Sequence, residues 1–160
     1  MSLDVLSTKG QQSIRDEVHA VQLFNSKYSD YRYVETPKGM PADVDALLMH
    51  GNQLRQVIET KCRYDCDITK FMGSYKGEWL VTWEKIEKAK NLAKQLCIGL
   101  TGFLYLVPSK TLLVQKITDE TGRLLVPMRL ETTETQATIN GGRALRTNAY
   151  ISMKNAVVIQ

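Results

Sequence analysis

The apolar positions near the start of the chain recur every three or four residues, as they do on one face of a helix: Ile14, Val18, Val21 and Phe24. Thr8 and Gln11 stand just before them with the spacing of a capping box, in which two side chains bond to free amide groups at a helix start. The pattern predicts an amphipathic helix over about residues 9–25.

Three short apolar runs follow, each bounded by turn-forming residues as strands are. Residues 31–35 form the first run, which ends at the turn-forming residues 36–39. Residues 42–49 and 54–62 form the next two, with the turn formers His50-Gly51-Asn52 between them. Two apolar runs so close together predict an antiparallel β-hairpin.

The second half of the chain holds a mixed stretch, one more helical pattern and further strand-like runs. Residues 64–81 mix polar and apolar side chains and contain Gly73 and Gly77, so we expect a loop there. From about Thr82 a helical stripe follows, made of Ile86, Ala89, Ala93, Leu96 and Leu100. Strand-like runs then lie at residues 103–107, 112–117 and 124–130. The polar tail from Thr132 carries no assignment.

The order of these elements predicts a single α/β domain over residues 1–160. Consecutive strands come without crossover helices, which favours a sheet packed with helices over a doubly wound parallel sheet. A chain of this length can bury one substantial core. Hydrophobic residues make up 43% and charged residues 24%, and this ordinary globular usage excludes a disordered or fibrous protein.

The net charge and the cysteine content exclude few classes of protein. The 21 Lys and Arg against 17 Asp and Glu give a net charge of +4, which permits a polyanionic partner without requiring one. Three cysteines favour reduced structural thiols over a disulfide scaffold or a four-thiolate metal site. No apolar stretch reaches about 18 residues, and the first residues lack a signal-peptide pattern. We therefore expect a cytoplasmic protein with no membrane partner.

Charged side chains interrupt the two buried runs of the predicted hairpin. With a turn centred on Asn52, Asp45 lies directly across from Glu59, and side chains paired in this way have Cβ atoms about 4.5–5.5 Å apart. The same register pairs Asp43 with Lys61. Because residues two apart in a strand share a face, these side chains are expected to cluster on one face of the sheet.

Buried charges are costly unless they are paired or bind a metal. Two carboxylates and a main-chain carbonyl are the hard oxygen ligands that Mg²⁺ prefers. A lysine nearby can orient or deprotonate an attacking water. The cluster therefore favours metal-assisted hydrolysis of a phosphodiester, with a salt-bridge ladder across the hairpin as the structural alternative.

The sequence Pro41-x-Asp43-x-Asp45, followed by Val57-Ile58-Glu59-Thr60-Lys61, resembles the PD-(D/E)XK nuclease superfamily, which has the restriction-endonuclease-like fold. The family core is a helix, three strands, a helix and a further strand, with a mixed central sheet flanked by helices. The resemblance covers about residues 8–118 and leaves 119–160 as a C-terminal extension.

The resemblance implies roles for individual residues of the hairpin. Asp45 and Glu59 would bind Mg²⁺, for which Mn²⁺ can substitute. The Thr60 carbonyl would be a third ligand, and Lys61 would stand beside the attacking water. Asp43 is the alternative to Asp45 as the first ligand.

Other positions are candidates for a second metal or for DNA. Many family members carry a glutamate on the first helix, and Glu17 fits that place, although a solvated helix charge fits it equally well. Basic residues that are candidates for contacts with DNA phosphates, each of which also fits a solvated surface, are Lys9, Lys38, Lys85, Arg143 and Arg146.

The resemblance implies a magnesium-dependent endonuclease that hydrolyses DNA. Within the superfamily the chain is most similar to Holliday junction resolvases, which act as homodimers in DNA recombination and repair in bacteria and phage-infected cells. No Gly-rich phosphate-binding motif is present, so no nucleotide cofactor is expected. Two alternatives stay open: a non-catalytic nucleic-acid-binding or assembly module with the same fold, and an unrelated α/β enzyme in which Glu59-x-Lys61 is coincidental.

Overall fold

The computed structural model describes residues 7–37, 42–134 and 142–160. Its helices are α1 (Thr8–Lys27), α2 (Ile68–Gly73), α3 (Trp83–Gln95) and the short 3-10 helix η1 (Val107–Ser109). Its strands are β1 (Tyr31–Glu35), β2 (Ala46–His50), β3 (Gln53–Arg63), β4 (Glu78–Thr82), β5 (Gly99–Leu106), β6 (Thr111–Lys116), β7 (Met128–Glu134), β8 (Leu145–Ser152) and β9 (Val157–Ile159).

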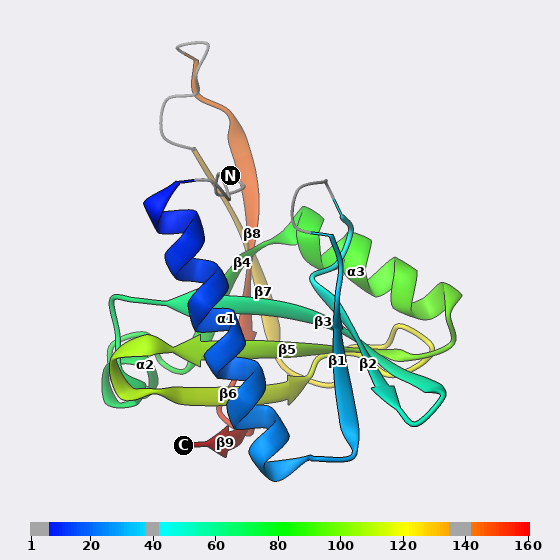
Figure 1. Cartoon of the computed structure of the whole chain (residues 1–160). Helices are drawn as coiled ribbons and strands as arrows, with labels where there is room; N and C mark the ends of the chain where they lie inside the picture. Colours follow the sequence, from blue (N-terminus) through cyan, green and yellow to red (C-terminus); the bar gives the residue numbers. More distant parts are fainter. Residues whose placement is uncertain (1–6, 38–41, 135–141) are drawn as a thin grey trace.

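A six-stranded mixed sheet forms the middle of the fold, in the order β1-β2-β3-β5-β6-β9 (Figure 1). Neighbouring strands are antiparallel except β3 and β5, which run parallel. The chain passes from β3 to β5 through α2, β4 and α3, because a parallel pair needs a long crossover connection. The predicted α/β class is confirmed, and so is the antiparallel pairing of β2 with β3.

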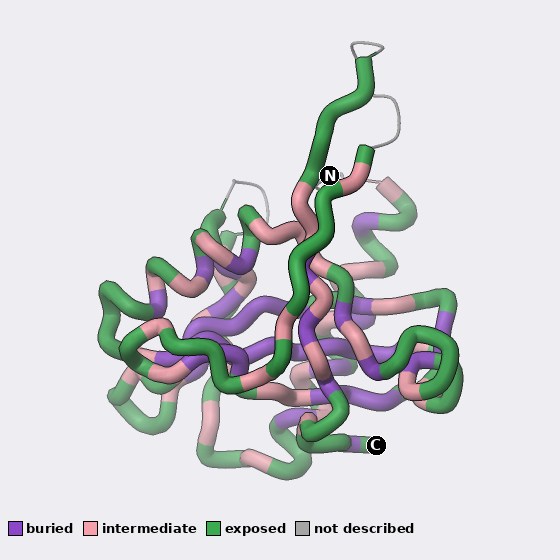
Figure 2. Tube along the Cα trace, turned by 180° about the vertical axis from the view of Figure 1, so that it is seen from behind, coloured by how far each residue is buried: buried purple, intermediate pink, exposed green. Residues whose placement is uncertain are grey.

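Two hydrophobic cores lie on opposite faces of this sheet. Helix α1 crosses one face (Figure 1), where Phe24 packs with Ile58 and Phe103. Helix α3 covers the other face, and its Ile86 shares a core with Val57. Because successive strand residues point to opposite faces, β3 serves both cores in alternation. Figure 2 shows the buried positions concentrated along the central strands.

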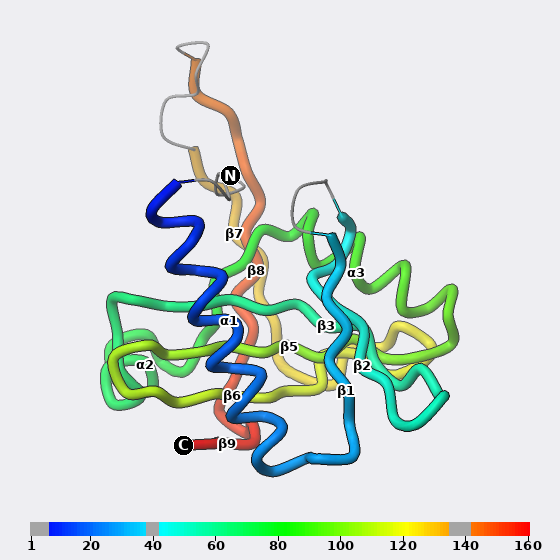
Figure 3. The backbone as a smooth tube through the Cα atoms, viewed as in Figure 1, coloured from blue at the N-terminus to red at the C-terminus, as the bar shows by residue number. Residues whose placement is uncertain are grey.

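A three-stranded antiparallel sheet, β4-β8-β7, accompanies the larger one. Trp79 of β4 is buried and approaches β5 so closely that a Cβ at Gly102 would lie 2.4 Å from its ring. Only glycine permits that approach. Figure 3 shows β7 and β8 continuing past the body of the molecule, and Leu145 on this projection is exposed.

The expected helix over residues 9–25 is present as α1, but its details differ from the prediction. Its cap is Ser7, whose side chain accepts a hydrogen bond from the Gly10 amide at 3.0 Å. Val18, placed in the apolar stripe, is 43% exposed, whereas the polar Asp16 is buried. On the buried side, the Asp16 carboxylate accepts a hydrogen bond from the Gln12 side chain one turn earlier, at 3.1 Å.

The loop expected over residues 64–81 was the largest error, because α2 and β4 form there. Asp67 caps α2 by accepting from the Lys70 amide. β4 pairs with the distant strand β8, a partner that no local pattern reveals. The helix expected to reach Leu100 ends at Gln95, since Cys97 adopts a left-handed φ of 56° and Leu100 is buried in β5.

The residues left without an assignment at the C-terminal end add strands to both sheets. β7 and β8 belong to the smaller sheet, and β9 pairs with β6 at the edge of the larger one. The run expected at residues 124–130 becomes a regular strand only from Met128. Within the described residues, no helix is both long enough and apolar enough to span a membrane.

Candidate active site

The register of the β2–β3 hairpin sets Asp45 against Glu59. Ala46 pairs with Ile58, and the same register continued by one residue puts Asp45 across from Glu59. The Asp45 amide donates to the Ile58 carbonyl at 3.2 Å, and Asp45 Oδ2 accepts from the Thr60 amide at 2.8 Å. β2 begins at Ala46, so Asp45 lies one residue before the ladder, next to Glu59 at the open end of the hairpin.

The second predicted pairing, of Asp43 with Lys61, lies outside the ladder. β2 begins at Ala46, and Asp43 lies in the bend before it. A register shift between Leu48 and Met49 also changes the pairing near the turn, where His50 is opposite Gln53. The two residues between His50 and Gln53 form a tight turn, in which Gly51 adopts a left-handed φ of 60°.

The Glu59 carboxylate is the most buried charge of the site, with its side chain only 1% exposed. Its Oε2 lies 3.1 Å from the Lys85 Nζ, and Oε1 has no hydrogen-bond partner among the described residues. Burial, and then the neighbouring Asp45 carboxylate, raise the pKa of Glu59 to about 9, although Lys85 opposes the shift. Without a stronger cation than Lys85, Glu59 holds a proton at neutral pH.

Lys85 brings a positive charge to both acids from the first turn of α3. Its Nζ is 3.6 Å from Asp45 Oδ2 as well as 3.1 Å from Glu59 Oε2. Burial lowers the pKa of Lys85, but the two carboxylates outweigh that effect and the net shift is upward. The side chain remains 46% exposed, so it is open to solvent while it contacts the acids. Lys85, expected on an open surface as a DNA contact, thus lies at the acid pair.

Lys61 extends from the same face of β3 as Glu59, two residues further along the strand. Partial burial lowers the pKa of Lys61, and the charges of Arg63 and Lys85 lower it further. Within the described part of the chain no ion pair joins Lys61 to Asp45 or Glu59. Lys61 therefore stands near the acids with an ammonium that releases its proton more readily than usual.

Thr60 and Glu17 lie on the α1 side of the sheet. The Thr60 hydroxyl and the Tyr33 hydroxyl share a hydrogen bond of 2.8 Å. Burial raises the pKa of Tyr33, and the charges of Glu17 and Asp45 add to the rise. Asp45 and Glu17 are thus both close enough to act on one phenol, although Glu59 points to the opposite face. Tyr33 was not among the predicted site residues; its signal was the tyrosine repeat Tyr31-x-Tyr33.

The remaining predicted DNA contacts are scattered over other elements. Lys9 is exposed in the first turn of α1, and Arg146 is exposed on β8. Arg143 is exposed before β8 and lies 3.4 Å from Glu134. Lys38 lies outside the described residues. The structure does not gather Lys9, Arg143 and Arg146 with the acid pair.

The donor set of the site suits a hard cation but is sparse. Among residues 7–37, 42–134 and 142–160 no group of three or more His, Cys, Asp or Glu side chains is arranged to hold a metal. Asp45 and Glu59 offer two carboxylates, and a main-chain carbonyl such as that of Thr60 would complete an oxygen set. The Lys85 ammonium within 4 Å of both acids indicates a position that attracts positive charge.

Cysteine ligands play no part in this site. Cys62 belongs to the core under α1 and Cys66 to the core under α3, so the two thiols lie in separate apolar environments.

Comparison with protein-family models finds no model that matches the chain, and no curated protein sequence matches it.

Proposed function

We propose that this protein is a metal-dependent deoxyribonuclease that hydrolyses DNA phosphodiester bonds at a PD-(D/E)XK-type site. The observation that carries the proposal is the buried Glu59 carboxylate, held across the hairpin from Asp45 with Oε1 unpartnered. A carboxylate pair of this kind costs stability, because burial and like charge both oppose ionisation. A buried acid of raised pKa, here Glu59, beside a lysine of lowered pKa is characteristic of catalytic sites.

The residues that would hold Mg²⁺ or Mn²⁺ are Asp45, Glu59 and the Thr60 carbonyl, with Glu17 as a candidate for a second ion. When bound, the ion supplies positive charge to the phosphate oxygens and makes water acidic enough to attack. It also neutralises the acid pair, which otherwise repels a phosphate backbone.

The two lysines have different parts in this proposal. Lys61, with its lowered pKa, orients the attacking water and exchanges a proton with it. Lys85 balances the acids before a cation binds. Once they are neutralised otherwise, its exposed ammonium is available to a phosphate oxygen of the DNA. This gives the surface-accessible Lys85 a role in both states of the site.

A second candidate is a non-catalytic DNA-binding module that keeps the fold of a nuclease. The Lys85 contacts favour it, because an ammonium that bridges Asp45 and Glu59 can replace a metal as a permanent structural partner. In that case the site stabilises the hairpin against α3 and needs no divalent ion.

A cleavage panel separates the two candidates. Labelled four-way junction, flap, duplex and single-stranded DNA are incubated with the protein in Mg²⁺, Mn²⁺ or EDTA. The nuclease proposal expects cleavage of at least one substrate with metal only, and loss of cleavage in Lys61→Ala. Lys116→Ala is the matched control, because Lys116 is also an exposed strand lysine but lies on β6. Absence of cleavage of every substrate with either metal contradicts the proposal.

The preferred substrate within this class is a branched DNA, cut by a homodimer. A symmetric junction presents two equivalent strands, and two copies of the site related by a two-fold axis match them. Preference for the four-way junction over the duplex, with a dimeric mass in solution, supports this finer part of the proposal.

A further inference from the structure

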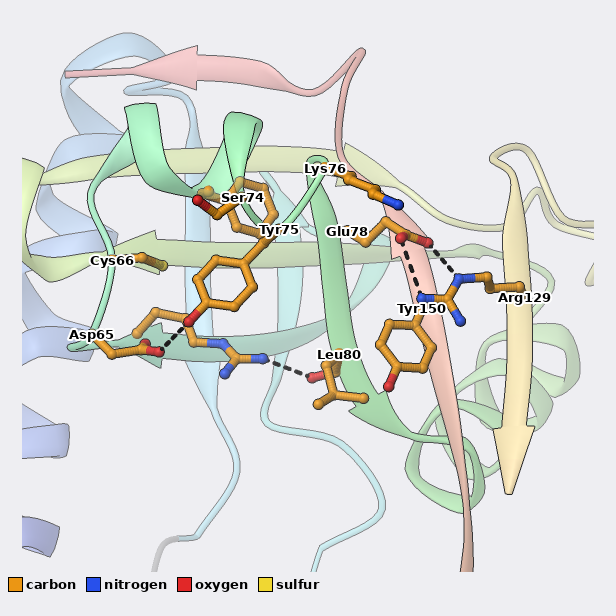
Figure 4. Close-up of a pocket in the computed structure, with 11 residues that line it drawn as sticks. Asp65, Cys66, Ser74, Tyr75, Lys76, Glu78, Leu80, Arg129 and Tyr150 are labelled. Carbon is orange, nitrogen blue, oxygen red and sulfur yellow. Dashed lines mark hydrogen bonds and ion pairs between the residues drawn. The ribbon is translucent and has the colours of Figure 1, made fainter. Parts of the chain in front are cut away.

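A cavity of about 370 Å³ lies beyond the acid pair, where the end of β3 meets the turn after α2 and the outer face of the smaller sheet (Figure 4). The side chains that define its character are Arg63, Tyr75, Lys76, Leu80, Arg129 and Tyr150. The volume falls within the range of small-ligand sites. Neither the proposed cleavage nor the acid pair involves this cavity.

Two tyrosine rings line this cavity, and a cation lies over each of them; for Tyr75 it is Lys70, whose Nζ is 5.6 Å from the ring centre. The Tyr75 hydroxyl donates to Asp65 at 3.1 Å, and its side chain is 42% exposed. The Arg129 guanidinium lies 3.8 Å from the centre of the Tyr150 ring. Figure 4 shows Leu80 in the region between the two tyrosines. Flat aromatic faces with an apolar neighbour suit a planar ring better than an aliphatic ligand.

The cavity is lined by three cations, Arg63, Lys76 and Arg129, and by two acids, Asp65 and Glu78. Glu78 accepts from Arg129 at 3.0 and 3.3 Å, and Asp65 accepts from Tyr75. Arg63 has only a carbonyl partner, Leu80 O at 3.3 Å, among the interactions of the described residues. Lys76, in a left-handed turn at φ 56°, also lines the cavity. The ionisable side chains of the lining therefore sum to a net charge of +1 next to aromatic rings.

The strand β3 connects this cavity to the acid pair. Glu59, Lys61 and Arg63 alternate along β3 and share one face. A rise of about 3.3 Å per residue puts Arg63 roughly 13 Å from Glu59 along the strand. Lys61 stands between them, so positive side chains line the whole path, and a short single strand of DNA can follow such a path.

We infer that this cavity binds an unpaired nucleotide of the DNA substrate, with the base against Tyr75 and Tyr150 and the phosphate at Arg63 and Lys76. The inference rests on the proposed function for its choice of ligand. Every base presents a flat face to an aromatic ring, so the site selects for an unpaired base and not for a particular sequence. Double-stranded DNA keeps its bases stacked and cannot fill the cavity without losing that stacking.

The test uses a six-nucleotide single strand that carries 2-aminopurine, a base whose fluorescence falls when it stacks on another ring. Binding is measured in EDTA, so that no strand is cut. Wild-type protein and Tyr75→Phe should bind and quench the probe. Tyr75→Ala should bind about 10-fold more weakly, because one stacking contact contributes about 1–3 kcal/mol. Tyr64→Ala is the matched control, since Tyr64 is similarly exposed but lies in the bend after β3 and does not line the cavity.

The outcomes separate this inference from the nuclease proposal. Binding and quenching that are equal in wild type and Tyr75→Ala overturn the nucleotide cavity, whether or not the protein cuts DNA. Equal quenching by a duplex with the probe base paired overturns the preference for an unpaired base, and failure of the wild type to bind the strand overturns the whole inference. Quenching that depends on Tyr75 in a protein that cuts no DNA supports the cavity and contradicts the nuclease.

Discussion

The Lys85 ammonium lies 3.1 Å from the carboxylate of Glu59, a side chain that is otherwise sealed from solvent. The contact joins the third residue of α3 to the middle of β3. It leaves the second oxygen of Glu59 unpartnered, and it does not bring the pKa of Glu59 back to its ordinary range. The single ammonium of Lys85 is therefore not enough to keep Glu59 ionised at neutral pH.

Replacing the acid should make the protein more stable. Glu59 has a pKa of about 9 in the folded protein against 4.5 ordinarily, so the folded state holds a proton that the unfolded state has lost. Its favourable contribution is complete below pH 4.5 and is lost as the pH rises towards 9. Glu59→Gln removes this dependence, and the free energy of unfolding at pH 8 should rise by about 1–2 kcal/mol.

Urea unfolding at pH 5, 7 and 9 checks this prediction. The wild type should lose stability across that range more steeply than Glu59→Gln. Glu84→Gln is the control, because Glu84 is an exposed helix acid. If the wild-type and Glu59→Gln curves are parallel in pH, the assignment of a raised pKa to Glu59 is wrong.

Removing the Lys85 ammonium should destabilise the protein, and a divalent ion should restore the lost stability. Lys85→Met keeps the aliphatic stem but leaves both carboxylates without a cation. A cost of about 1–2 kcal/mol is expected at pH 8, below the value for a fully buried pair because Lys85 is partly exposed. Mg²⁺ should raise the Tm of Lys85→Met more than that of the wild type. Lys88→Met, which loses only the surface pair with Glu84, should show neither effect.

Metal binding should strengthen as the pH rises. Glu59 must lose its proton before it can ligate a cation, so each bound ion displaces about one proton near neutral pH. Isothermal titration with Mn²⁺ at pH 6.5 and 8.5, in buffers of different ionisation enthalpy, measures both the affinity and the protons released. Equal affinity at the two pH values, with no proton release, contradicts the role of Glu59 as a ligand.

The close approach of the two sheets predicts a strong effect at one glycine. Gly102→Ala places a methyl group 2.4 Å from the buried Trp79 ring and should cost about 1–3 kcal/mol. Gly73→Ala meets nothing within 4 Å and lies at the end of α2, so it should be neutral or slightly stabilising. Chemical denaturation of the two variants compares them directly. Equal stability would show that Trp79 moves aside freely.

The acid pair could be predicted from the sequence because its geometry is local. A hairpin with a short turn pairs its two strands, and the register that forms brings Asp45 opposite Glu59. The turn alone does not give this register. Continued from the His50–Gln53 pair without the shift between Leu48 and Met49, the ladder would set Asp45 opposite Ile58, so the pairing depends on an irregularity that the sequence pattern did not predict.

The rest of the site depends on contacts between distant segments. Lys85 reaches Glu59 only because the crossover from β3 to β5 lays α3 over that face, and a stripe of apolar residues does not show where a helix will dock. The cavity at Tyr75 requires β4 to pair with β8, so a stretch that looks like a loop becomes the wall of a site. The exposure of Val18 has the same origin, because tertiary packing chose a different face of α1.

The central claim, metal-dependent cleavage by the acid pair, is tested most directly by the initial rate of cutting of a labelled four-way junction in Mg²⁺. The comparison is between the wild type, Asp45→Asn and Asp43→Asn, two substitutions of the same chemistry two residues apart. The account predicts that Asp45→Asn loses about 100-fold or more of the rate, as expected for a lost metal ligand, because Asp45 contacts Lys85 and the Thr60 amide beside Glu59. Asp43→Asn, two residues further from β2, should stay near wild type. Equal rates for Asp45→Asn and the wild type, or cutting that persists in EDTA, would contradict it.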